Sequence, residues 1–349
     1  MVYKIVRTFA PENARCREPE NARQAAHGMR CRTVKNGTMP DVKHLQAMSK
    51  LLRKRLYGLP YQGSKNTIAE WILEKMPPAV MFFDLFAGGC AISHAAMTSG
   101  KYSCVYGNDI ECYPFLFRDV IEGIFPDIWN YVSREEFYNV KDILQKDDVY
   151  RAFVLSAYSF SGDLNVYYKS IEDSENYGDE IRARYEDIVG KFGVYDFETI
   201  LSRIKNREKD SLMSRNKALE SVARMIELHL SMKDNHTKFV PMMNSYDEVY
   251  IPDYSNPFSG FFAVIYCDIP YRNTKKYSYM KFDYERFYDW CEAQKHPVFI
   301  SEVSMPEDRF ECITERDKIS FFSKQRNDFN YTERLFVPKC QLKMLEKYV

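Results

Sequence analysis

The stretch VIYCDIPYRNTKKY, from Val264 to Tyr277, decides the fold and the chemistry of this chain. Its first three residues are apolar, and together with the two phenylalanines just before them they predict a buried strand. The strand should end near Asp268, because Pro270 has no backbone N–H to donate to a neighbouring strand. We therefore expect this strand to present a polar pocket at the edge of a sheet.

The four residues DIPY, from Asp268 to Tyr271, suit one kind of ligand. An ionised Asp268 only accepts hydrogen bonds, and Pro270 turns Ile269 away from helical geometry, so that the Ile269 carbonyl can accept as well. Tyr271 adds a flat ring for stacking. Two acceptors beside a stacking face fit a planar group with an amine, such as a purine or pyrimidine. The alternative for so short a motif is a strand followed by a tight turn.

A glycine turn earlier in the chain predicts the first unit of a nucleotide-binding fold. Val80 to Leu85 (VMFFDL) is strand-like, FAGGC follows it, and AISHAAM is compatible with a helix. Gly88 and Gly89 would let the backbone approach a ligand at the N-terminus of that helix. The next apolar run ends shortly before Asp109, where such folds bind ribose hydroxyls. The spacing from Gly88 to Asp109 supports this interpretation.

The segment YGLPYQGSK, from Tyr57 to Lys65, precedes a helical pattern that runs to Met76. A loop with an aromatic residue, a glycine and a lysine at the start of a helix could hold a small ligand that bears a carboxylate. A capped surface helix explains the same pattern equally well, and the residues leave both interpretations open.

Composition restricts the class of protein. The 349 residues are 45% hydrophobic and 28% charged, which favours a soluble globular chain with a sizeable core. Lys plus Arg equals Asp plus Glu at 49 each, so any contact with nucleic acid must come from local basic patches. The 9 cysteines show no CxxC pair and no zinc spacing, which predicts reduced thiols in a cytoplasmic protein without a metal. The longest apolar stretch is interrupted by polar residues, so we expect no membrane span.

The order of the segments predicts three regions. Residues 1–47 contain PENAR twice and lack apolar periodicity, which predicts a disordered basic arm that is either inert or bound to DNA phosphates, or sequence upstream of a true start at Met48. Residues 48–112 and 239–349 should form one α/β core. Residues 113–238 carry helical patterns and charge runs, which predict an inserted helical subdomain. After Asp268 we expect a helix and three strands, at Phe282 to Ala293, Pro297 to Ser301, Lys318 to Phe322 and Arg334 to Val337.

The order of these motifs resembles that of the DNA adenine-N6 methyltransferases of the D12 class, which carry a (D/N)PPY site. The resemblance rests on PYQGSK, DLFAGG, GNDI, a long insertion, NSYDEV and CDIPY, and it extends from about Tyr57 to Lys339. The segments SFSGDLNVYYKSIE, FDYERFYDW, PVFISEVSMPED and YTERLFVPK look like phage and prophage members of that family. Several motifs in a fixed order are far more specific than any one alone.

The resemblance implies a Rossmann-like core that binds S-adenosylmethionine, and an insertion that recognises a target site in double-stranded DNA. It implies a monomer that methylates a flipped adenine at N6, and it leaves open a cognate restriction endonuclease. It implies catalytic roles for Asp268 and the Ile269 carbonyl, which accept from the target N6, and for Pro270 and Tyr271, whose ring stacks on the adenine. The implied cofactor contacts are Tyr61, Lys65, Phe86, Gly88, Asp109 and Asp268.

Two positions depart from the family pattern. Ile269 stands where the motif usually has its first proline, and Cys90 stands where the glycine loop usually has a further glycine. Neither change removes a charged or stacking group. Because of these two departures, a DNA-binding homologue with a decayed active site is the main alternative. A nucleotide-dependent oxidoreductase is a second alternative, which would share only the glycine turn and Asp109.

Overall fold

The computed structural model describes residues 56–190, 193–209, 213, 216–254, 260–271, 282–319 and 330–346. The predicted arm, residues 1–47, lies outside these ranges, as do residues 272–277 of the quoted stretch and residues 320–322 of a predicted strand. In the part of the chain that is described, no helix is both long enough and apolar enough to cross a membrane.

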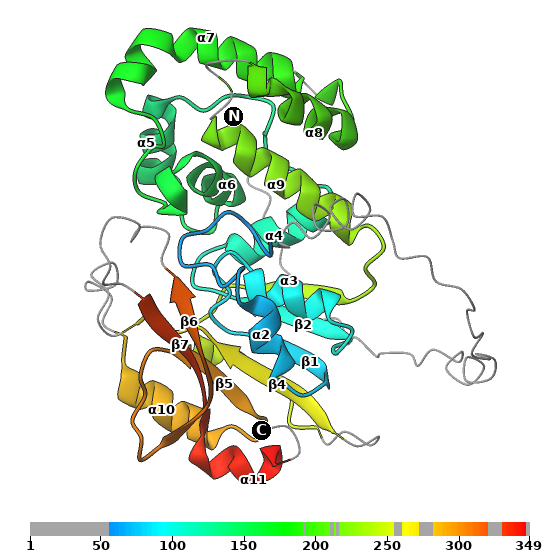
Figure 1. The fold of residues 1–349 in the computed structure, drawn as a ribbon, viewed down its shortest axis with the longest axis vertical. Coiled ribbons are helices and arrows are strands. Elements are labelled where there is room, and N and C mark those ends of the chain that lie inside the picture. Colours follow the sequence, from blue (N-terminus) through cyan, green and yellow to red (C-terminus); the bar gives the residue numbers. More distant parts are fainter. Residues whose placement is uncertain are drawn as a thin grey trace, which may run out of the picture. The chain divides into compact units, whose positions relative to one another are not determined.

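In the described ranges, seven strands form one mixed sheet in the order β3-β2-β1-β4-β5-β7-β6 (Figure 1). The strands β1 to β5 pair in parallel, and β7 pairs antiparallel with both β5 and β6. Their bounds are β1 Ala79–Asp84, β2 Cys104–Asn108, β3 Lys238–Met242, β4 Phe261–Cys267, β5 Val298–Glu302, β6 Phe310–Ile319 and β7 Asn330–Pro338. The predicted α/β fold with a Rossmann-like core is confirmed.

The strand order reverses between β1 and β4. From β1 the chain moves outward through β2 to β3, then returns to place β4 on the other side of β1 before continuing to β5. Open α/β sheets bind their ligands outside the carboxyl ends of the strands at such a reversal. The DIPY residues follow β4 directly and the glycine turn follows β1, so both predicted motifs lie at this position.

Alternating residues of the central strands face two separate cores. On β1 and β4, Phe82 and Val264 join one buried cluster, whereas Phe83 and Ile265 join the other. Helices α2 (Ala69–Glu74), α3 (Ala91–Thr98) and α4 (Tyr113–Ile121) contribute to the first cluster, and α10 (Tyr284–Ala293) to the second. Because both faces are covered, the central strands read as continuous apolar runs and not as alternating ones.

A group of helices lies between β2 and β3 in the chain (Figure 1). Helix α9 packs against α4, α6 and α8, and a ring contact of 4.9 Å between Phe117 of α4 and Phe239 of β3 joins this group to the sheet. Capping side chains fix several helix starts, for example the reciprocal pair of Ser133 and Glu136 at α5. The bounds are α5 Arg134–Ile143, α6 Val149–Tyr158, α7 Ile171–Val189, α8 Phe197–Lys205 and α9 Lys217–Met232, and the short α11 is Leu342–Leu345.

Two strands differ from the sequence expectations. Strand β3 was not expected, because KFVPM is short and contains Pro241. Among the described strands β3 lies at the edge of the sheet, with β2 as its neighbour there, and a proline can be tolerated on an edge strand. The strand expected at Lys318 to Phe322 begins much earlier, at Phe310, since four successive charged residues, Glu315 to Lys318, leave β6 without the apolar run of a central strand.

Gly58 should tolerate alanine much less well than Gly100 does. Both have a left-handed φ, +69° and +70°, but an added Cβ at Gly58 would lie 2.3 Å from the Gly89 carbonyl oxygen, whereas Gly100 has open space around it. We expect Gly58→Ala to lower the unfolding free energy in urea by roughly 2 to 4 kcal/mol, and Gly100→Ala by about 1 to 2 kcal/mol. Equal losses of unfolding free energy in the two variants would mean that Gly58 is not tightly packed against the glycine turn.

Candidate functional site

Polar residues gather where the central strands end. Asp84 and Asn108 are the last residues of β1 and β2, Asp268 follows β4, and Glu302 ends β5. The turn after β1 joins these ends, because the Leu85 amide donates to the Tyr266 carbonyl and the Ala87 amide to the Asn108 carbonyl. The glycine loop is therefore fixed between β4 and β2.

Asp109 is bound to the glycine turn. One carboxylate oxygen of Asp109 accepts from the Gly88 amide at 2.8 Å, and the other accepts from the Glu111 amide at 3.1 Å. Burial raises the pKa of Asp109 to about 6, although both backbone hydrogen bonds lower it. Each carboxylate oxygen has two lone pairs, so both can accept a further hydrogen bond, for instance from a ribose hydroxyl.

Tyr61 and Phe86 place aromatic rings beside this turn. An added Cβ at Gly88 would lie 3.0 Å from the Tyr61 ring, so only a glycine lets the two segments approach this closely. Phe86 is half-buried and contacts the rings of Tyr246 and Phe287, with centroids 5.6 and 5.9 Å away. The structure thus brings Tyr61, Gly88 and Asp109 together and places Phe86 in an adjoining aromatic cluster.

Lys65 contacts the DIPY residues and not the glycine turn. Its Nζ lies 2.5 Å from Asp268 Oδ1 and 4.9 Å from the centre of the Tyr271 ring. Burial alone would lower the pKa of Lys65, but the carboxylates of Asp268 and Glu333 raise it well above its usual value. Lys65 is therefore a charged ammonium within the predicted catalytic residues.

Glu333 on β7 completes this charged group, and the sequence analysis did not identify it. Its Oε1 accepts from the Tyr271 hydroxyl at 2.7 Å and lies 3.6 Å from Lys65 Nζ. Its signal in the sequence is an acid that shares a strand face with Leu335 and Val337, both of which are buried. Ile269, in contrast, packs its side chain into the core beneath the site.

Asp84 stabilises the start of α3 from the end of β1. Its Oδ2 accepts from both the amide and the hydroxyl of Ser93, in the first turn of α3, at 3.1 and 2.7 Å. Cys90, the residue before α3, has a left-handed φ of 58° and caps no amide with its side chain. Asp84 therefore supplies the acceptor that a capping residue would otherwise provide.

The buried Asp84 makes the stability of the ligand-free protein depend on pH. Burial raises its pKa to about 7, with the Ser93 hydrogen bonds acting in the opposite direction. An unfolded aspartate titrates at about 3.9, so in the window between these values the folded state holds more protons and stability falls as pH rises. We expect the unfolding free energy in urea to drop less between pH 5.5 and pH 8 in Asp84→Asn than in the wild type. An identical drop in both proteins would contradict this assignment.

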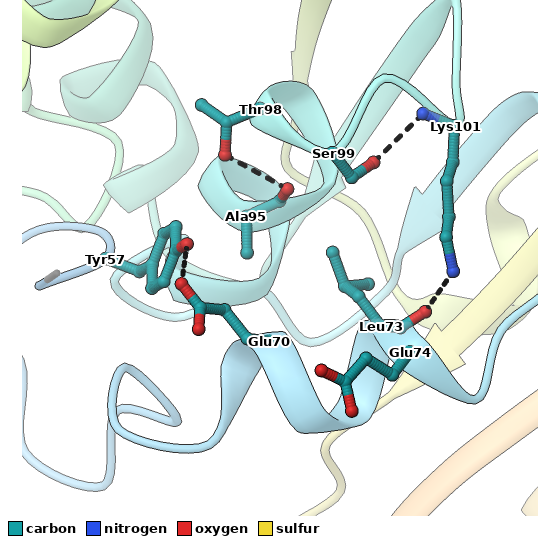
Figure 2. A pocket seen from close by; sticks show the side chains of 8 residues that line it. All are labelled: Tyr57, Glu70, Leu73, Glu74, Ala95, Thr98, Ser99 and Lys101. Carbon is teal, nitrogen blue, oxygen red and sulfur yellow. Dashed lines mark hydrogen bonds between the residues drawn. The ribbon is translucent and has the colours of Figure 1, made fainter. Parts of the chain in front are cut away.

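A pocket of about 220 Å³ lies away from these residues, between α2 and α3 (Figure 2). Figure 2 shows Tyr57 donating to Glu70 and the ammonium of Lys101 donating to the Leu73 carbonyl, at 2.7 and 2.6 Å. These contacts hold the loop before α2 and the last turn of α2. The pocket adjoins the C-terminal end of α3, whereas the glycine turn precedes its N-terminal end, so none of the predicted site residues lines it.

Metal ligands do not cluster in the described ranges, where no group of three or more His, Cys, Asp or Glu side chains is placed to hold an ion. The polar groups at the carboxyl ends of the strands instead combine hydrogen-bond acceptors, aromatic rings and one ammonium. Such a set can bind hydroxyl and amine groups and stack on planar rings.

Comparison with known proteins identifies a family whose model covers the residues of this site, from Tyr61 to Asp268. The family model for D12 class N6 adenine-specific DNA methyltransferase matches residues 61–331. A viral protein, the Type II methyltransferase M.CviAII of Paramecium bursaria Chlorella virus 1, is 29% identical over 150 residues, which are 41% of this chain and 43% of that protein. The matched part therefore spans less than half the length of this relative.

Proposed function

Because the chain belongs to the D12 class of N6 adenine-specific DNA methyltransferases, we propose that it transfers a methyl group from S-adenosylmethionine to the N6 amine of adenine in DNA. The observation that carries this proposal is the position of Asp268. Its carboxylate lies directly after β4, beside Tyr271 and at the reversal of the strand order, where the glycine turn also lies. Asp268, Tyr271 and the glycine turn thus meet at the carboxyl ends of the central strands, which supports the roles of acceptor, stacking ring and cofactor loop that we propose for them.

Residues of the protein would activate the target amine by orienting it. The lone pair of an aromatic amine is delocalised into its ring, so the nitrogen is a poor nucleophile. Asp268 and the Ile269 carbonyl would accept its two N–H hydrogens and direct the lone pair at the methyl carbon. The new N–C bond would form as the C–S bond breaks, sulfur would keep that electron pair, and the nitrogen would release one proton to water. This displacement requires no metal.

The residues at the glycine turn fit the proposed cofactor. S-adenosylmethionine supplies an electrophilic methyl group on a positively charged sulfur. Asp109 is a partly desolvated carboxylate with spare lone pairs, which suits ribose hydroxyls. The rings of Tyr61 and Phe86 offer apolar faces nearby, and Gly88 has no side chain to obstruct the turn. Lys65 would lie at the binding site of the target amine and not at the ribose, since it pairs with Asp268.

The target adenine must leave the duplex to reach Asp268, so base flipping is part of the proposal. The core motifs would then be occupied by the cofactor and the flipped base, and the neighbouring base edges must be read by other residues. The helices between β2 and β3 are the part of the described chain available for this task. We propose residues 113–238 as the region that selects the target site.

Exchange of these helices should change the modified sequence. Helix α4 contacts β3, and α9 reaches the core through Arg224, whose guanidinium donates to the Tyr57 carbonyl at 2.8 Å. A chimera should therefore keep α4 and α9 and replace only α5 to α8 with those of a relative that methylates another site. We expect methylation to follow the donor of the helices when the DNA is sequenced. An unchanged site would place recognition in α4, in α9 or in the core.

Sequencing for modified bases tests the proposal against its main alternative, a homologue with a decayed site. DNA from cells that express the protein should contain N6-methyladenine in one recurring sequence context, and DNA from cells with an empty vector should not. Purified protein that binds DNA and S-adenosylmethionine without incorporating methyl groups would support the decayed site instead.

A further inference from the structure

Glu333 is a buried acid in an apolar environment. It is fully buried on β7, where Leu335 and Val337 share its face and pack into the larger core cluster. Moving a carboxylate out of water costs free energy unless charged or hydrogen-bonding partners compensate for the lost hydration. Its nearest partners are two residues of the proposed site, Tyr271 and Lys65.

The contact with Tyr271 fixes a ring. The Tyr271 hydroxyl donates to Glu333 Oε1 at 2.7 Å, and a hydrogen bond to an ionised acceptor is among the stronger ones. A tyrosine held at its hydroxyl has less freedom to rotate its ring about the side-chain bonds. Glu333 therefore sets the orientation of the face on which the target adenine would stack.

Lys65 and the target adenine would compete for the same two residues, Asp268 and Tyr271. The Lys65 ammonium lies 2.5 Å from Asp268 Oδ1 and 4.9 Å from the centre of the Tyr271 ring. It therefore occupies the carboxylate and lies over the ring that the adenine would use. Glu333 Oε1, at 3.6 Å, is a second acceptor within reach of the same ammonium, and Glu333 Oε2 has no hydrogen-bond partner among the described residues.

We propose that Glu333 is a positioning residue: it orients Tyr271 through its hydroxyl, and it takes over Lys65 when Asp268 accepts the target amine. No covalent bond changes in this step, because the ammonium only exchanges one carboxylate for another. The inference rests on the proposed function, since it assigns the site's second acid a part in the same reaction.

Glu70 provides a matched control outside the site. Its carboxylate accepts from the Tyr57 hydroxyl at 2.7 Å, the same distance as the contact of Glu333 with Tyr271. It lies on α2 in the pocket of Figure 2, which none of the predicted site residues lines. Glu70→Gln therefore changes a glutamate bound to a tyrosine hydroxyl and leaves Tyr271, Lys65 and Asp268 as they are.

The test measures kcat and KM for methyl transfer from labelled S-adenosylmethionine to DNA from a host without adenine methylation. Glu333→Gln keeps an acceptor for Tyr271 but lacks the charge for Lys65, so KM for DNA should rise about tenfold with kcat within about threefold. Glu333→Ala lacks both and should also lower kcat by about 10- to 100-fold. Glu70→Gln should stay within about threefold of the wild type in both constants.

A double-mutant cycle separates positioning from simple loss of structure. Tyr271→Phe keeps the ring and removes the hydroxyl, so adding it to Glu333→Ala should lower kcat little further, because the shared hydrogen bond is already absent. The same cycle on urea midpoints reports the contact without any turnover. Losses that multiply in kcat, a Glu333→Gln protein with wild-type KM, or equal effects of Glu70→Gln would overturn the proposal. A wild-type protein that transfers no methyl group would instead remove the proposed function, while the urea cycle still reported the hydrogen bond.

Discussion

Asp268→Ala should abolish methyl transfer, with a loss in kcat of at least about 100- to 1,000-fold. The variant lacks the carboxylate that we propose accepts from the target N6, so the nitrogen lone pair is no longer directed at the methyl carbon. Asp268→Asn keeps one acceptor oxygen without the charge, so its rate should lie between that of the wild type and that of Asp268→Ala. The measurement is the rate of labelled methyl incorporation into DNA at saturating cofactor.

The structure indicates how to separate this loss from unfolding. Lys65 would keep Glu333 as a partner when Asp268 is removed, so the buried ammonium is not left alone. Asp253, which pairs with Lys295 on the surface, offers a control in which an acid of an exposed ion pair is removed. Asp253→Ala should methylate at the wild-type rate. If Asp268→Ala methylated DNA at the wild-type rate, the DIPY residues would have no catalytic role and would only be a turn that follows a strand.

Asp109→Ala should weaken the binding of S-adenosylmethionine by roughly 10- to 150-fold, the effect expected for loss of a hydrogen bond to a charged group. Two contributions combine in this variant. The ribose hydroxyls would lose their acceptor, and the Gly88 amide would lose its 2.8 Å partner, which loosens the glycine turn. Isothermal titration calorimetry of the purified protein measures the change directly.

Asp109→Asn separates these two contributions. It can still accept from the Gly88 amide, so the turn should remain ordered while the charge is lost, and the affinity should fall less than in Asp109→Ala. Asp119→Ala on α4, which removes an acid paired with Arg118, should bind the cofactor like the wild type. Unchanged affinity in Asp109→Ala would exclude this residue from the cofactor site.

The sequence predicted the parts of the fold whose signals are local. Strands β1 and β4 are apolar on both faces and end at Asp84 and shortly before Asp268, and a glycine turn follows the first of them. Such runs with abrupt polar ends are recognisable without any knowledge of their neighbours. The spacing from Gly88 to Asp109 predicted that both belong to one nucleotide-type unit, and in the structure the Gly88 amide donates to Asp109 at 2.8 Å.

The features that escaped prediction depend on pairing across the sheet. Lys65 and Asp268 are 203 residues apart, and Glu333 reaches Tyr271 only because β7 inserts antiparallel between β5 and β6. No local pattern specifies which strand becomes the neighbour of which. Strand β3 was missed for a related reason, since Pro241 argues against a central strand and only the topology shows that β3 lies at an edge.

Nucleoside analysis of treated DNA tests the central claim most directly. Purified protein, S-adenosylmethionine and DNA from a host without adenine methylation are incubated, and the DNA is digested to nucleosides for mass spectrometry. The account predicts that N6-methyldeoxyadenosine appears as the methylated product, in amounts that grow with time and vanish with Asp268→Ala. Methyl groups on another base, or equal N6-methyldeoxyadenosine from the wild type and Asp268→Ala, would contradict it.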